Sequence, residues 1–115
     1  MTTLSFERGV GLAGWQIELA RNVEMLIELA RTTRRGNRWV IDDDEIASRL
    51  ATIRAEVKAL RAMTYILVSK VARGTAGAEG TVVGLHFAEL AKRFHRLSLD
   101  VLGLDAIERR PEEGD

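Results

Sequence analysis

The feature that most constrains the fold of this chain is a set of apolar residues whose spacing alternates between four and three. One run of this kind extends over residues 46–71, and the same alternation returns over residues 83–101. The runs consist of Ile46, Leu50, Ile53, Val57, Leu60, Thr64, Leu67 and Val71, and of Val83, Phe87, Leu90, Phe94, Leu97 and Val101. Such spacing places residues on one face of an α-helix, whereas strands alternate apolar and polar residues. Because the sequence lacks strand-like alternation and has one proline, Pro111, we predict an all-α fold.

A third periodic segment precedes these two, from about Phe6 to Arg34. Its apolar face at steps of three and four consists of Leu12, Trp15, Leu19, Val23, Leu26 and Ala30. Gly9, Gly11 and Gly14 lie in its first turns, where each glycine costs about 1 kcal/mol relative to alanine. We therefore expect another backbone or a ligand to approach this helix closely.

The connection between the first two helices is basic and then acidic. Its arginines interact favourably with the negative C-terminus of the first helix. Gly36 or Asn37 can adopt the left-handed conformation that ends a helix. Asp42, with Glu45 three residues later, predicts a capping box at the start of the second helix. We therefore predict a basic loop between two helices.

The length of the three helices indicates how they pack. Segments of about 27 residues are about 40 Å long, and short connections between them favour antiparallel neighbours, so we predict an up-down bundle of three long helices. Such a bundle leaves apolar surface uncovered, because Trp15 and Ile17 lie about 200° apart on the first helix and Tyr65, Ile66 and Val68 lie beyond the main face of the second. We expect another helix or another subunit to cover this surface.

Composition limits the classes of function. A chain of 115 residues predicts one domain, smaller than a complete cofactor-dependent oxidoreductase. Lys plus Arg and Asp plus Glu both number 17, which favours neither nucleic acid nor an anionic membrane. The absence of cysteine, of an N-terminal leader pattern and of any apolar run of about 18 residues predicts a cytoplasmic protein without a membrane span.

The sequence supports neither a di-iron site nor a nucleic-acid-binding site. Di-iron bundles need paired Glu-x-x-His motifs, whereas His86 and Glu89 stand in the reverse order and His95 has no second ligand at helical spacing. The arginines at positions 31, 34, 35 and 38 are followed by aspartates and have no aromatic platform, so we expect no nucleic-acid partner.

Several short motifs occur in a characteristic order. They are Phe6-Glu7-Arg8-Gly9, Leu29-Ala30-Arg31-Thr32-Thr33, Arg54-Ala55-Glu56-Val57-Lys58-Ala59-Leu60-Arg61 and Glu89-Leu90-Ala91. In this order the chain resembles the C-terminal helical domain of acyl-CoA dehydrogenases over residues 4–107. The resemblance implies that residues 1–115 are part of a four-helix-bundle domain, incomplete at both ends. It also implies an enzyme that removes two hydrogens from an acyl-CoA thioester with FAD, as a homo- or hetero-oligomer.

The same resemblance implies roles for three residues. Glu7 matches the glutamate of a Glu-Arg pair that serves in some members as the catalytic base, and a first-turn acid that stabilises the helix N-terminus is the alternative. Arg31 and Thr33 match a motif that contacts the flavin pyrophosphate of a neighbouring subunit. The alternative for Arg31 is an arginine-rich helix C-terminus.

Two departures from the family pattern bear on cofactor binding. Arg34-Arg35-Gly36 stands where the family has Phe-Gly, and residues 100–106 keep one glycine of a glycine-rich flavin contact. These departures imply a subunit that has lost one of its cofactor contacts, or a member of a divergent bacterial branch. The alternative function is a non-enzymatic helical oligomerisation module, because heptad spacing by itself predicts helix association and nothing more.

Overall fold

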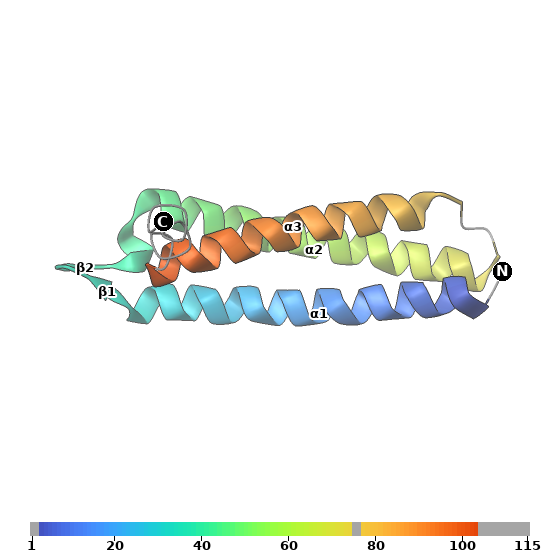
Figure 1. The fold of residues 1–115 in the computed structure, drawn as a ribbon, viewed down its shortest axis with the longest axis horizontal. Helices are drawn as coiled ribbons and strands as arrows, with labels where there is room; N and C mark the ends of the chain where they lie inside the picture. Colours follow the sequence, from blue (N-terminus) through green and yellow to red (C-terminus); the bar gives the residue numbers. More distant parts are fainter. Residues whose placement is uncertain (1–2, 75–76, 104–115) are drawn as a thin grey trace, which may run out of the picture.

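The computed structural model describes residues 3–74 and 77–103, with side chains at 11, 13–70, 72–74 and 77–103. Three long helices run side by side (Figure 1). In chain order the elements are α1 (Thr3–Thr32), β1 (Arg34–Arg35), β2 (Arg38–Trp39), the 3-10 helix η1 (Val40–Asp42), α2 (Asp44–Ala72) and α3 (Glu79–Leu102). Helix α2 runs antiparallel to α1 and α3. The predicted all-α, up-down bundle of three helices is therefore confirmed.

The core is a continuous stripe along the inner faces of the helices. In α2 every described residue of the predicted face is buried, and in α3 the two phenylalanines of the face are partly buried against the same core. Val71 lies outside the described side chains. The buried apolar residues are Leu19, Val23, Leu26, Ala30, Val40, Ile46, Leu50, Ile53, Val57, Leu60, Leu67, Val83, Leu90, Leu97 and Val101.

The predicted face of α1 is wrong at one position. Trp15 is 66% exposed and stacks on Phe87 of α3, whereas the neighbouring Gln16 is 1% exposed. Positions three and four residues before Leu19 both fit a helical face, and the bundle turns position 16 inward. The amide of Gln16 therefore lies in the core, where the indole of Trp15 is predicted from the sequence.

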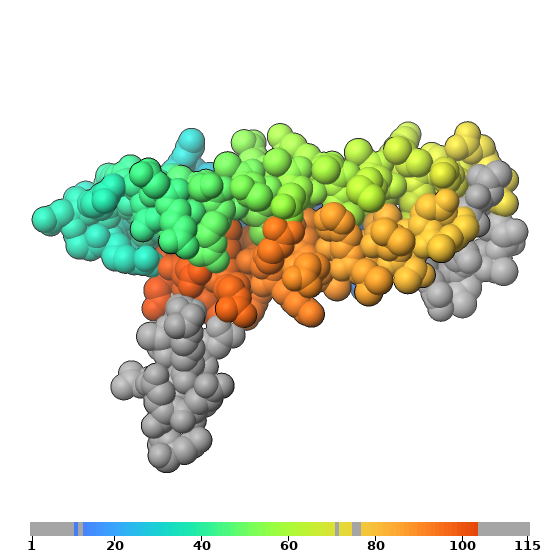
Figure 2. Space-filling model, turned by 90° about the horizontal axis from the view of Figure 1, so that it is seen from above, coloured from blue at the N-terminus to red at the C-terminus, as the bar shows by residue number. Residues whose placement is uncertain are grey.

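The first connection differs from the predicted loop. Arg34 pairs with Trp39 and Arg35 with Arg38 in a short antiparallel hairpin, and Gly36 takes its left-handed position (φ 69°) in the turn rather than as a helix cap. This hairpin projects at one end of the bundle in Figures 1 and 2. It brings two-residue strands into an otherwise helical fold.

The predicted capping box at Asp42 is also wrong. The cap of α2 is Asp43, whose Oδ1 accepts hydrogen bonds from the backbone N–H groups of Glu45 (2.9 Å) and Ile46 (3.2 Å). Asp42 belongs to η1, and its carbonyl accepts a hydrogen bond from Arg38. The 3-10 turn shifts the start of the helix by one residue.

Pairs of charged side chains tie α2 to both neighbours. Arg54 Nε lies 2.8 Å from Glu24 Oε2 of α1. On the other side, Arg93 of α3 binds Glu56 through two guanidinium nitrogens. These pairs are half-exposed, so they align the helices more than they stabilise them.

The glycines of α1 have free space around them. A Cβ atom added at Gly11 or Gly14 would meet nothing within 4 Å, so no described part of this chain makes the expected close approach. Gly9 lies outside the described side chains. Among the described residues, no helix has the length and apolar character needed to cross a bilayer.

Candidate functional site

The hairpin end of the bundle gathers most of the cations that the sequence analysis singled out. The hairpin end comprises Arg31, Thr33, Arg34, Arg35, Arg38 and Trp39, which follow from the C-terminus of α1 into the two strands. All of these residues except Thr33 are exposed, and Thr33 is partly buried. The cations lie where the carbonyl end of α1 carries partial negative charge, so they favour the helix terminus and also offset its repulsion of an anion.

Three of the four arginines of the hairpin end, Arg34, Arg35 and Arg38, donate hydrogen bonds to backbone carbonyls of the chain. Arg35 Nη2 donates to the carbonyls of Asp100 (2.7 Å) and Val101 (2.9 Å), which holds the hairpin against the end of α3. Arg38 Nη2 donates to the Asp42 carbonyl at 2.8 Å. These contacts fix the hairpin to the bundle.

Arg34 has its own pair of contacts. Its guanidinium carbon lies 4.5 Å from the centroid of the Trp39 ring, and Nη2 donates to the Asn37 carbonyl at 3.2 Å. A cation–π contact at an exposed site contributes about 0.5–1 kcal/mol. Arg34 therefore stiffens the turn.

Arg31 and Thr33 form no side-chain hydrogen bond with a described residue. Within the described residues, Arg31 meets one acid, Glu28, at 4.0 Å, and its side chain is 65% exposed. The hydroxyl of Thr32 bonds back to the Glu28 carbonyl (3.0 Å), but no hydrogen bond from the Thr33 hydroxyl to a described residue is formed. The two positions predicted to contact a flavin phosphate are thus the least committed donors of the hairpin end. A guanidinium and a hydroxyl are both donors that suit a phosphate.

The third predicted site residue lies far from these two. Glu7 is the fifth residue of α1, whose first turn contains no acid, so the alternative role of a first-turn acid is wrong. The side chain of Glu7 is outside the described ones. Twenty-four residues separate Glu7 from Arg31 on this helix, a distance of about 36 Å along the axis. The structure therefore does not bring Glu7 together with Arg31 and Thr33.

The part of the bundle nearer to Glu7 has a polar group that sequence reasoning missed. Gln16 is buried, and neither its amide nitrogen nor its amide oxygen has a hydrogen-bond partner among the described residues. The sequence does indicate that Gln16 is buried, because the four-three alternation of the other helices continues in α1 if Gln16 is included. The positions are 12, 16, 19, 23, 26 and 30. A face defined by apolar residues alone contains Trp15 in place of Gln16.

Two other contacts near the hairpin end had no sequence signal. Arg49 of α2 binds Asp100 of α3 at 2.6 Å, and the Asp100 carbonyl accepts a hydrogen bond from Arg35. These residues are 51 and 65 positions apart in the chain, so only packing shows the cluster. In the described ranges, no group of three or more His, Cys, Asp or Glu residues could hold a metal ion.

Comparison with known proteins identifies the family. The model for the acyl-CoA dehydrogenase C-terminal domain matches residues 1–113. The chain belongs to this family. It is also 34% identical over 103 residues to acyl-CoA dehydrogenase IpdE1 of Mycobacterium tuberculosis, a match that covers 90% of this chain and 25% of that protein. The chain thus spans about a quarter of the length of this relative, and no solved structure gave a significant match.

Two of the residues expected to depart from the family motif have structural roles. Arg34 stacks on Trp39, and Arg35 binds the end of α3. They therefore contribute to the shape of the hairpin end. Of the segment at residues 100–106, where the loss of a flavin contact is expected, residues 104–106 lie outside the described residues.

Proposed function

We propose that this chain serves as the C-terminal helical domain of a flavin-dependent acyl-CoA dehydrogenase, within an oligomeric assembly that supplies the rest of the enzyme. The observation that carries this proposal is the family match over residues 1–113. The proposed reaction is α,β-dehydrogenation of an acyl-CoA thioester. FAD, when bound, would accept the hydride from the β carbon.

In this proposal, Arg31 and Thr33 hold the pyrophosphate of FAD bound by a neighbouring subunit. Support comes from their free donors, because the other arginines of the hairpin end are engaged in holding its shape. Further support comes from the distance of about 36 Å between Arg31 and Glu7 along α1. One helix would then serve two cofactor sites, one at each end.

Glu7 is proposed as the base that removes the α proton of the acyl group. A carboxylate in this role needs a pKa raised toward the working pH, which enclosure by the other domains would provide. The exposed apolar residues of the same half of the bundle support such enclosure, since Trp15 is 66% and Leu85 is 68% exposed.

The flavin contact is tested by substituting Arg31 in the assembly isolated through a tag on this chain. Arg31→Gln should lower the FAD content at limiting FAD, because one charge-assisted contact to the pyrophosphate is lost. Arg21→Gln is the matched control, since Arg21 is an exposed arginine of the same helix, more than two turns away. Equal FAD retention in both variants would refute the role of Arg31.

Base catalysis by Glu7 is tested with Glu7→Gln in the same assembly. Substrate-driven flavin reduction should slow by about 10²-fold or more while acyl-CoA binding is retained, because the amide keeps the shape but accepts no proton. Stopped-flow bleaching of the flavin measures this step separately from product release. An unchanged reduction rate would assign the base elsewhere.

A second candidate function is a non-enzymatic helical oligomerisation module. The observation that favours it is the exposure of large apolar side chains, with Tyr65 at 77% and Leu85 at 68%. Light scattering should show self-association of the isolated chain at micromolar concentration, and the chain alone should be colourless and inactive toward acyl-CoA. An assembly that contains no flavoprotein subunit would favour this second function over the first.

A further inference from the structure

A cleft between α2 and α3 combines arginines and hydroxyl groups in a way that no step of the proposed dehydrogenase uses. The α2–α3 cleft has a volume of about 220 Å³ and is lined by Ser48, Arg49, Thr52, Ile53, Arg93, Arg96 and Leu97. Its apolar floor is formed by Ile53 and Leu97, which are both buried core residues. The two helices lie against each other along their length (Figure 2), so the cleft is formed by regular elements of the bundle.

Two arginines of the cleft are held in place by acids of the opposite helix. Arg93 reaches from α3 to Glu56 of α2, and Arg49 reaches from α2 to Asp100 of α3. The hydrogen bonds with Arg93 lower the pKa of Glu56, so this pair stays charged at neutral pH. The two pairs cross the cleft in opposite directions and hold its walls together.

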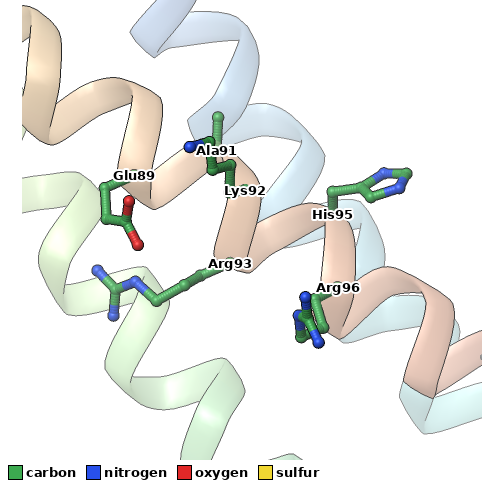
Figure 3. A pocket seen from close by; sticks show the side chains of 6 residues that line it. All are labelled: Glu89, Ala91, Lys92, Arg93, His95 and Arg96. Atoms are coloured by element: carbon green, nitrogen blue, oxygen red, sulfur yellow. The ribbon is translucent and has the colours of Figure 1, made fainter.

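The third arginine supplies a surplus positive charge. Arg96 lines the cleft, and it forms no ion pair or hydrogen bond with the described residues. Figure 3 shows Arg93 extending toward α2 and Arg96 following it along α3, whereas His95 points away from them. An adjoining depression of about 510 Å³ on α3 is lined by Lys92, Arg93 and Arg96, with one acid, Glu89, beside them. Arg96 is therefore the cleft arginine whose charge is not paired with an acid among the described residues.

Hydroxyl groups complete the donor set from the other wall. Ser48 and Thr52 are four residues apart on α2, a spacing that places both on one side of the helix, and both line the cleft. Neither hydroxyl has a hydrogen-bond partner among the described residues. Because a free guanidinium and two free hydroxyls face a shared space, the cleft offers donors in several directions at once.

We propose that the α2–α3 cleft binds a phosphate group, with Arg96 as its principal ligand and with Ser48 and Thr52 as additional donors. A phosphate has enough acceptor oxygens to engage all three donors, and arginine binds it in a fork of two hydrogen bonds. A carboxylate has two oxygens and engages fewer of these donors. The site belongs to α2 and α3 and shares no residue with the proposed flavin contact of Arg31 and Thr33, so either can fail without the other.

Titration of the ¹⁵N-labelled chain with inorganic pyrophosphate at low ionic strength tests the site. Apart from any shifts at the proposed flavin contact of Arg31 and Thr33, amide shifts should concentrate at residues 48–53 and 92–97. Arg96→Gln should weaken binding in the cleft by about tenfold or more, because a charge-assisted contact is lost. Arg61→Gln is the matched control: Arg61 is an exposed α2 arginine outside the cleft and should leave the affinity unchanged.

A second variant keeps the test valid if Arg96→Gln does not fold. Ser48→Ala combined with Thr52→Ala should weaken pyrophosphate binding by several-fold and leave the circular dichroism spectrum unchanged. Shifts scattered over all exposed arginines, or equal weakening by Arg96→Gln and Arg61→Gln, would overturn the proposal. A glutamate-rich peptide that binds as tightly as pyrophosphate would also overturn it, since the cleft would then be a site for an acidic protein segment.

Discussion

The two halves of the bundle differ in how completely the chain satisfies its own groups. The hairpin half contains the C-terminal half of α1, the hairpin, the first half of α2 and the second half of α3. There Asp43 caps α2, Arg35 binds the last carbonyls of α3, and Arg49 pairs with Asp100. Helix ends leave unpaired backbone groups that side chains must satisfy, and here these side chains come from distant parts of the same chain.

The open half contains the remaining parts of the three helices, and there Lys70 at the end of α2 pairs with Glu79 at the start of α3. Gln16 is buried there with both amide atoms unpaired, and large apolar side chains of all three helices face outward. They are Trp15, Ile17, Met63, Tyr65, Ile66, Val82 and Leu85. Gly11 and Gly14 add a flat surface with open space above it.

The difference indicates a division of roles within one short domain. Contacts within the chain satisfy the helix ends of the hairpin half, although Met25, Leu29, Trp39 and Leu102 are exposed there. The open half has the larger set of exposed apolar side chains, as expected where another polypeptide packs. This division matches the proposed function, in which the remainder of a much larger enzyme covers the end of α1 that contains Glu7. It also implies that stability and assembly can be perturbed separately.

The largest expected effect comes from truncating the core in the hairpin half. Leu50→Ala should lower the free energy of unfolding by about 2–5 kcal/mol, because it leaves a cavity among closely packed helices. Tyr65→Ala in the open half removes a larger side chain but should change the free energy by less than about 0.5 kcal/mol. Urea denaturation of both variants measures the contrast, and similar losses would remove the distinction between the halves.

The next effect should be a gain in stability within the open half. Gln16→Leu should raise the free energy of unfolding by about 1–2 kcal/mol, because it replaces a buried amide without partners by an apolar group of similar size. Asn22→Leu on the same helix is the control, and its effect should be smaller because Asn22 is only partly buried. A loss of stability in Gln16→Leu would show that the amide is paired within the folded chain.

A smaller effect distinguishes the two candidate caps of α2. Asp43→Ala should cost about 1 kcal/mol, the usual value of a helix N-cap. Asp42→Ala should lie within about 0.5 kcal/mol of the parent chain, since its carboxylate does not cap α2. Thermal or urea unfolding is sufficient for this test, and the reverse order of effects would restore the capping box predicted from sequence.

The smallest effect concerns the pair that joins α2 and α3 near the boundary of the two halves. The hydrogen bonds from Arg93 lower the pKa of Glu56, although partial burial opposes this shift. Because the pKa in the folded chain lies below that of the unfolded chain, the stabilisation is present above the unfolded pKa. It is lost as the pH falls through the folded pKa.

Glu56→Gln should therefore cost up to about 1 kcal/mol at pH 7, since the pair is partly exposed, and nothing once the pH is below the folded pKa. Urea denaturation of the parent and the variant between pH 3 and pH 7 gives the difference. Glu18→Gln is the control, because Glu18 is exposed and has no ion pair among the described residues. A difference that stays constant across this range would mean that the charge of Glu56 does not contribute.

The sequence by itself determined the helical class, the number of long helices and the buried faces of α2 and α3. It did so because an uninterrupted four-three alternation of apolar residues has one way to avoid water, which is to place a single face of a helix inward. The family was also evident from local motifs such as Phe6-Glu7-Arg8-Gly9. These features depend on neighbours within one or two turns, so they are visible along the chain.

Only the tertiary structure decided which of Trp15 and Gln16 enters the core, and whether Asp42 or Asp43 begins α2. In each case the two residues are adjacent in the sequence. Trp15 and Gln16 both fit the helical spacing of a buried face, and Asp42 and Asp43 can both serve as N-cap, so the packing of the other elements selects between them. The same holds for the free donors of Arg31 and for the arginine and hydroxyl groups of the α2–α3 cleft. A guanidinium is free or engaged according to which distant carbonyls and carboxylates come within about 3 Å of it, and those distances are set when the helices pack.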